Sequence, residues 1–307
     1  MLTPDNPYFP QVRLLVAVLP FVAREECFAL KGGTAINLFV RAMPRLSVDI
    51  DLAFVPTVGR TAALREISGA MERIKETLEG GSPAYRVYGG SREDGRRYAM
   101  MVAGIGAEIK IEVSPVLRGS VYPETLRRIA PAAEEQFGFA EVRSLSFEDL
   151  YAGKIVAALD RQHPRDLFDV KLLLENEGIS DNLFRAFLVY LISHSESMAR
   201  VINPRPKSLQ ELFERQFANM SAEPVTLAEL ETARTNLIAA LHAKMGTTEK
   251  DFLLSFKRGE PRWELLGIEH APELPAVRWK LQNLAGMGVA ERNAVVGNLE
   301  RVLANIR

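Results

Sequence analysis

The sequence predicts an α+β fold, with a mixed β-sheet and flanking helices in the first half and an all-helical second half. Two segments, SVDIDLAFV (47–55) and AEIKIEVSPV (107–116), alternate apolar and polar residues, which is the period of a half-buried strand. Between them, 61–81 has helical spacing and ends in a glycine pair. After about residue 145 the strand signals fade and helical patterns fill the chain.

The remaining elements of the first half follow from apolar spacing and turn residues. Residues 1–10 carry three prolines and predict an irregular arm, followed by a helix over 11–26. FALKGGTAINLFV (28–40) predicts a short strand, a Gly-Gly turn and a helix. YRVYGG and RRYAMMVAG predict two strands of a hairpin around the polar loop at 91–95.

The second half predicts helices separated by breaks that contain proline or glycine, such as NPRPKS (203–208). We therefore expect two domains, a core domain over 1–145 and a helical domain over 146–307 that completes an active-site cleft. The expected helices cover 147–159, 165–178, 181–195, 209–217, 226–245, 249–259 and 291–307.

Composition bounds the function only loosely. The formal net charge of the 307 residues is -1, so a nucleic-acid-binding surface would have to be a local basic strip. A single cysteine, Cys27, excludes a disulfide scaffold and a cysteine-ligated zinc site. No apolar run approaches the roughly 18 residues that suggest a membrane span, so we expect a cytoplasmic protein that does not enter a membrane.

Two aspartates stand on one face of the strand predicted at 47–55. Alternation places Asp49 and Asp51 side by side, roughly 6.5–7 Å apart. Two unpaired carboxylates repel each other, so a positive group must lie there, either an arginine or a hard cation such as Mg²⁺. A D-x-D pair on a solvent-facing strand can also be without function.

Three further features favour phosphate chemistry at this strand. Gly32-Gly33-Thr34 opens a helix just before it, and helix starts with glycine bind phosphate through backbone N–H groups. Glu112, on the other alternating strand, can supply a third carboxylate to a metal. The order of glycines, D-x-D and a later strand carboxylate is what a metal–triphosphate site needs.

These residues carry a family resemblance. KGGTAINLF followed by RLSVDIDLAF resembles the nucleotidyltransferase superfamily with the polymerase-beta-type core. Together with EDLYAGKIVAALDRQHPRDLFDV (148–170), they resemble more narrowly the AbiEii/AbiGii toxin family, which includes the mycobacterial MenT toxins. The resemblance implies a toxin that acts beside a separate antitoxin. It also implies Mg²⁺-dependent transfer of a nucleotide, with Mn²⁺ as a substitute, from an NTP to the acceptor end of tRNA, which blocks translation.

The resemblance also implies residue roles near the front of the chain. Asp49 and Asp51 would hold the metal, with Glu112 as a third ligand where an aspartate is the stricter expectation. Gly32, Gly33 and Thr34 would line the triphosphate. Ser47 precedes the acidic pair on the same strand face, and its hydroxyl could donate to a phosphate oxygen or be an ordinary polar strand-edge group.

Further along the chain, Lys154 lies in an otherwise apolar helix and would contact the triphosphate as a point charge, although a lone lysine there can also be a surface residue. Asp166 would orient Lys154, act as a base or cap its helix, and Asp169 lies one turn further on. His163 has no second ligand at metal-binding spacing and is interpreted as a loop or capping residue.

Two alternatives remain open at the level of sequence. One is a kinase-like transfer of the γ-phosphate on the same fold, and the other is a non-catalytic protein that binds nucleotide or a partner. For the leading hypothesis we expect a cleft between the D-x-D strand and the helix with Lys154. RNA would bind a basic strip that includes Arg205, Lys207, Lys257 and Arg258.

Overall fold

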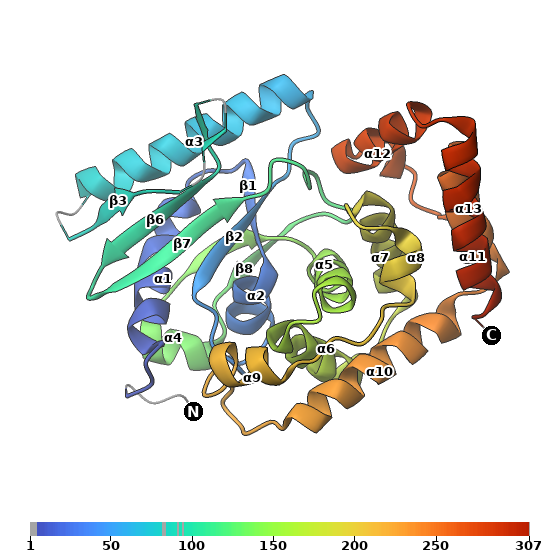
Figure 1. Ribbon diagram of the computed structural model, residues 1–307. Helices are drawn as coiled ribbons and strands as arrows, with labels where there is room; N and C mark the ends of the chain where they lie inside the picture. The colour runs from blue at the N-terminus through green and yellow to red at the C-terminus, as the bar shows by residue number, and fades with distance from the viewer. Residues whose placement is uncertain (1–4, 82–83, 91, 94, 307) are drawn as a thin grey trace. The chain divides into compact units, whose positions relative to one another are not determined.

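The computed structural model describes residues 5–81, 84–90, 92–93 and 95–306. The chain forms two compact units (Figure 1). We call Met1–Ser146 with Asn219–Pro224 the sheet unit, and Phe147–Ala218 with Val225–Arg307 the helical unit. Two parts of the sequence predictions, residues 1–4 of the arm and two positions of the loop at 91–95, lie outside the described residues.

Within the described part of the sheet unit, a seven-stranded sheet has the order β3-β6-β7-β2-β1-β9-β8. It is mixed, because β2 runs parallel to β7 and β1 runs parallel to β9, while the other neighbours are antiparallel. The strands are β1 (Phe28–Lys31), β2 (Asp49–Phe54), β3 (Arg86–Tyr88), β6 (Ala99–Gly104), β7 (Ala107–Val113), β8 (Thr125–Arg128) and β9 (Glu141–Ser144), with a small separate hairpin of β4 (Arg92–Glu93) and β5 (Arg96–Arg97).

Helices bury the apolar face of this sheet. Ile50, Leu52 and Phe54 alternate along β2 and are almost fully buried. The helix α1 (Phe9–Val22) packs on β7, β9 and α3 (Arg60–Gly81). The prediction for 61–81 is confirmed, whereas the first helix begins and ends earlier than the predicted 11–26. Pro10 fits the first turn of α1, because a helix start needs no N–H from that residue.

The opposite face of β2 meets the start of a second helix. The turn α2 (Gly32–Thr34) continues directly into a π-helix over Ala35–Val40, and α2 contacts β2. A short helix, α4 (Pro131–Phe137), completes the sheet unit. Residues 219–224 belong to this unit because two backbone hydrogen bonds tie them to it. The Leu46 N–H donates to the carbonyl of Met220 at 2.8 Å, and the Ala222 N–H donates to the carbonyl of Pro44 at 2.8 Å.

The described helical unit is built around α5 (Phe147–Asp160), which packs on α6, α7, α8 and α10. The helix α5 is therefore buried on most of its surface, Lys154 included. The other helices are α6 (Pro164–Asn176), α7 (Asp181–Ser193), α8 (Met198–Ile202), α9 (Gln210–Gln216), α10 (Leu227–Lys244), α11 (Thr247–Arg258), α12 (Pro275–Ala285) and α13 (Val289–Ala304), with 3₁₀ turns at Trp263–Leu265 and Ala271–Glu273. In the part of the chain that the structure describes, no helix combines the length and apolar character needed to cross a bilayer.

Candidate functional site

The D-x-D pair lies on the central strand β2, between β7 and β1. Asp51 stands directly opposite Lys31 of β1 and Glu112 of β7, and Asp49 stands opposite Lys110. Residues opposite each other in register share one face of a sheet. The face therefore carries three carboxylates and two amines, all on half-buried residues.

Gly32 places the helix start directly on the Asp51 carboxylate. Its φ of +73° lies in the region that favours glycine, and a Cβ there would lie 2.5 Å from Asp51 Oδ2. At Gly33 a Cβ would lie 2.8 Å from Arg45 Nη2 and 3.0 Å from Ser47 Oγ. Gly32 therefore suits this close approach through its φ, whereas a side chain at Gly33 would require the ends of Arg45 and Ser47 to shift.

Thr34 and Ser47 tie that helix start to the strand. Thr34 Oγ1 donates to the backbone carbonyl of Asp49 at 2.5 Å and lies 3.0 Å from Ser47 Oγ. Both side chains are buried. Their observed contacts hold the Gly-Gly turn against β2, and the phosphate contacts expected of them stay a prediction.

The donor set on this face fits a hard divalent cation in part. Asp49 and Asp51 provide two carboxylates on one strand, and such a cation completes its coordination shell with water and substrate phosphate. Glu112 pairs with Lys110 across the same face. Among the described residues, no group of three or more His, Cys, Asp or Glu side chains is arranged as a metal site. A third ligand from Glu112 therefore stays a prediction.

In the helical unit, Lys154 forms salt bridges with two buried aspartates. Its Nζ lies 2.8 Å from Asp166 Oδ1 and 3.0 Å from Asp169 Oδ2. The Lys154 side chain is 6% exposed and those of Asp166 and Asp169 are 1% and 0% exposed, so Lys154 is not a surface residue. Arg161, largely exposed, donates to Asp166 from Nε at 2.5 Å and from Nη2 at 2.9 Å.

This cluster balances two cations against two anions. Burial by itself raises the pKa of Asp166, but the charge of Lys154 and the hydrogen bonds from Arg161 outweigh it and hold that pKa well below its usual range. A carboxylate that remains ionised and paired at neutral pH is a weak proton acceptor. Of the roles left open by the sequence, the geometry favours orienting Lys154 over acting as a base.

The turn before α6 fixes this cluster. His163 is the N-cap of α6: its Nδ1 accepts from the Arg165 N–H at 3.1 Å, and its Nε2 lies 3.0 Å from Gln216 Oε1. Burial lowers the pKa of His163, so the imidazole is neutral at pH 7. The interpretation of His163 as a capping residue is confirmed.

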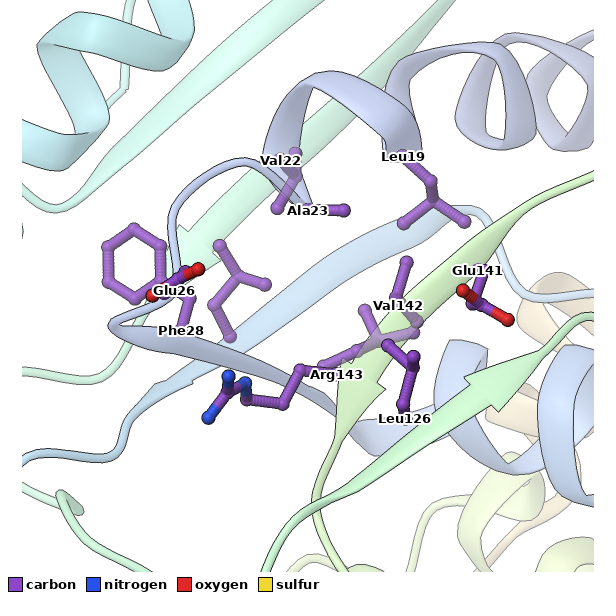
Figure 2. A pocket seen from close by; sticks show the side chains of 11 residues that line it. Leu19, Val22, Ala23, Glu26, Phe28, Leu126, Glu141, Val142 and Arg143 are labelled. Atoms are coloured by element: carbon purple, nitrogen blue, oxygen red, sulfur yellow. The ribbon is translucent and has the colours of Figure 1, made fainter.

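A cavity in the sheet unit is lined by none of the residues that form the polar face of β2. It has a volume of about 290 Å³ and is lined by Leu30 and Leu52, which stand opposite each other on β1 and β2. Figure 2 shows it between the end of α1, with Leu19 and Val22, and Val142 of β9. Because side chains alternate along a strand, Leu30 and Leu52 point away from the face with Lys31 and Asp51. The cavity therefore belongs to the apolar side of the sheet.

The sequence predictions assign no role to four residues at these clusters: Lys31, Arg45, Lys110 and Arg161. Arg45 lies two positions before Ser47, so extending the alternation back by one step would have found it. Lys31 becomes a neighbour of Asp51 only through the β1–β2 register, and Arg161 reaches Asp166 across the turn between α5 and α6. No local pattern signals either contact.

Comparisons with known proteins define the class of this protein as a nucleotidyltransferase toxin. The family model for the nucleotidyl transferase AbiEii toxin of type IV toxin–antitoxin systems matches residues 13–283. The chain therefore belongs to the AbiEii family, and the resemblance expected from the sequence is confirmed. Membership implies an NTP as substrate and an antitoxin as partner in general terms.

A solved structure shows the same fold. MenT4, a nucleotidyltransferase toxin from Mycobacterium tuberculosis H37Rv, matches with a TM-score of 0.61 and 15% identity, over 91% of this chain and 94% of MenT4. The predicted fold class, a nucleotidyltransferase core with a C-terminal helical region, is thereby confirmed. No curated protein sequence shows significant similarity to the chain.

Proposed function

We propose that this toxin transfers an NMP from an NTP to the 3′ end of tRNA and thereby blocks translation. The close approach of Gly32 to the Asp51 carboxylate carries the proposal, because it unites a glycine-rich helix start and the D-x-D pair within one unit. Such a start offers backbone N–H groups to phosphate oxygens, beside carboxylates suited to a phosphate-bound cation.

In the proposed reaction, the 3′-hydroxyl oxygen of the RNA bonds to the α-phosphorus of the NTP. The bond from that phosphorus to the oxygen bridging to the β-phosphate breaks, pyrophosphate leaves, and the hydroxyl proton passes to water. Asp49 and Asp51 would hold Mg²⁺ or Mn²⁺, which supplies charge neutralisation for the transferred and leaving phosphates when bound. The backbone at Gly32 and Gly33 would position the triphosphate.

We assign Lys154 to the triphosphate as a point charge and treat Asp166 and Asp169 as positioning residues. The ion pairs at 2.8 and 3.0 Å support this assignment, since they fix the Lys154 amine in one place. Asp49, Asp51 and Glu112 remain the proposed metal ligands, with Glu112 the least supported because it already pairs with Lys110.

The test is incubation of the protein with each labelled NTP, Mg²⁺ and total tRNA, followed by analysis of both products. Label from the α-phosphate in lengthened tRNA, together with released pyrophosphate, supports the proposal. A labelled γ-phosphate on a target, with a nucleoside diphosphate released, would support the kinase-like alternative instead. Glu108→Gln is a suitable control, because Glu108 is an exposed carboxylate on the same β7 strand as Glu112.

A further inference from the structure

The helical unit contains a polar cavity that the proposed chemistry does not use. It has a volume of about 580 Å³. It is formed by the end of α5, the following turn, α8, the loop at 203–207 and α13. The charged and amide side chains that line it include those of Asp160, Gln162, Arg200, Arg205, Lys207 and Asn298.

A buried hydrogen-bond network holds the loop at 203–207 in place. Gln162 is 1% exposed with a φ of +52°, and its Nε2 donates to the carbonyl of Arg205 at 2.8 Å. Its Oε1 accepts from the Lys207 N–H at 2.9 Å and from Arg234 Nη1 at 3.0 Å. Arg234, also buried, donates to the carbonyl of Lys207 at 2.8 Å. A fully paired buried network makes the loop rigid before any ligand arrives.

The rigid loop presents positive charge to the cavity. Arg205 is exposed, and Lys207 Nζ reaches the backbone carbonyl of Asp160 at 2.7 Å, a neutral acceptor that leaves the charge of the lysine uncompensated. Arg200 pairs with Glu196 at 2.6 Å on the rim. The three cations outnumber the carboxylates of Asp160 and Glu196, so this wall favours an anionic ligand.

The cavity lies close to Lys154 within the same unit. Asp160 ends the helix that carries Lys154, and six residues of helix span about 9 Å. In the turn after α5, two neighbouring side chains have different partners. Gln162 belongs to the hydrogen-bond network of the cavity loop, while Arg161 binds Asp166 of the Lys154 cluster. An anionic chain in the cavity would therefore run near the lysine assigned to the triphosphate.

We propose that this cavity binds the sugar-phosphate backbone of the RNA that receives the nucleotide. This inference rests on the proposed function and gives the acceptor a binding surface. Arginine and lysine on a preformed loop suit phosphate, and asparagine and glutamine suit sugar and phosphate oxygens. Of the basic strip expected from the sequence, Arg205 and Lys207 line the cavity. Lys257 and Arg258 do not, and Arg258 pairs with Glu300 at 2.7 Å.

The experiment measures binding of 5′-labelled tRNA without NTP over a series of salt concentrations, for wild type and for the Arg205→Ala/Lys207→Ala double variant. Each lost phosphate contact to a single strand reduces the slope of log K against log salt by about 0.7, so the double variant should lose about 1.4. Arg215→Ala is the matched control, because Arg215 is a 76% exposed arginine of the same unit that pairs with Glu211 away from the cavity. Arg205→Lys/Lys207→Arg should restore most of the slope.

Four outcomes decide the matter. A shallower slope in the double variant, at an unchanged melting temperature and with Arg215→Ala like wild type, supports the inference. Wild-type affinity and slope in the double variant overturn it, even where transfer to tRNA persists and the proposed function stands. Failure of wild type to bind tRNA also overturns it. Salt-dependent binding through Arg205 and Lys207 without any NMP transfer supports the surface and refutes the proposed function.

Discussion

The two clusters of charged residues in this toxin differ in burial and in how their charges are paired. On β2, Asp49 and Asp51 are half-buried and share their face with Lys31, Lys110 and Glu112. Around Lys154, the aspartates are fully buried and each has a cation within 3.0 Å. The first arrangement places carboxylates and amines together on a half-exposed sheet face, and the second pairs its charges in the interior of the helical unit. The comparison therefore contrasts a partly exposed set of charges with a buried set that is paired internally.

The largest expected effect is loss of activity on changing the strand. Asp49→Ala or Asp51→Ala should reduce nucleotide transfer by about a thousandfold or more, because a metal-assisted displacement without its metal loses several kcal/mol of transition-state stabilisation. The unfolding free energy should change by less than about 1 kcal/mol. Removal of one carboxylate relieves its repulsion with the other, but it also removes the attraction between that carboxylate and the partly exposed lysine opposite it.

The measurement pairs transfer activity with the melting temperature, with and without Mg²⁺ and NTP. Wild type should gain stability from the ligands by mass action and the variants should not. Glu108→Gln should behave like wild type in both assays. Full activity in Asp49→Ala, or inactivity accompanied by unfolding, contradicts the assignment of these residues to the metal.

The second effect concerns stability of the other cluster. Lys154→Met should destabilise the protein by about 3–5 kcal/mol, because it leaves two buried carboxylates without their shared cation. Adding Asp169→Asn should recover part of that loss. Lys171→Met, which breaks a partly exposed pair with Glu175, should cost about 0.5 kcal/mol or less. Equal costs for Lys154→Met and Lys171→Met in urea unfolding would show that the buried pairs do not hold this region together.

A third, smaller effect should come from the glycine that joins the two parts of the D-x-D site. Gly32→Ala should cost about 1–3 kcal/mol and lower transfer activity, because the residue has a φ of +73° and its Cβ would meet the Asp51 carboxylate. Gly80→Ala is the contrasting control: no atom lies within 4 Å of that Cβ and the position is helical, so stability should rise by about 0.5–1 kcal/mol. A stability gain at both glycines would argue against the close approach.

The smallest effect is a pH dependence of the positioning cluster. The folded-state pKa of Asp166 lies below its unfolded value, so its stabilising contribution is complete above the unfolded pKa of about 3.9 and is lost as the pH falls toward the folded pKa. The difference in melting temperature between wild type and Asp166→Asn should be constant from about pH 5 to 7 and shrink below about pH 4. A difference that instead grows with falling pH would mean that Asp166 is not held in its ionised form.

Local periodicity accounts for what could be predicted from the sequence. Alternation alone put Asp49 and Asp51 on one face, and the Gly-Gly pair indicated a helix start before them. The long helix at 61–81 was also clear. By contrast, β8 and β9 escaped prediction because each has a single apolar residue among its four positions, and α12 was missed as well.

The sequence by itself determined the family, the acidic strand and the lysine-bearing helix, because each depends on residues close together in the chain. Tertiary structure decided which charges meet. Strand order placed Lys31 and Glu112 on either side of Asp51, and the packing of α5 on α6 brought Lys154 to both Asp166 and Asp169. The reason is physical: register and helix packing are set by the burial of whole apolar faces, and polar contacts follow from that arrangement.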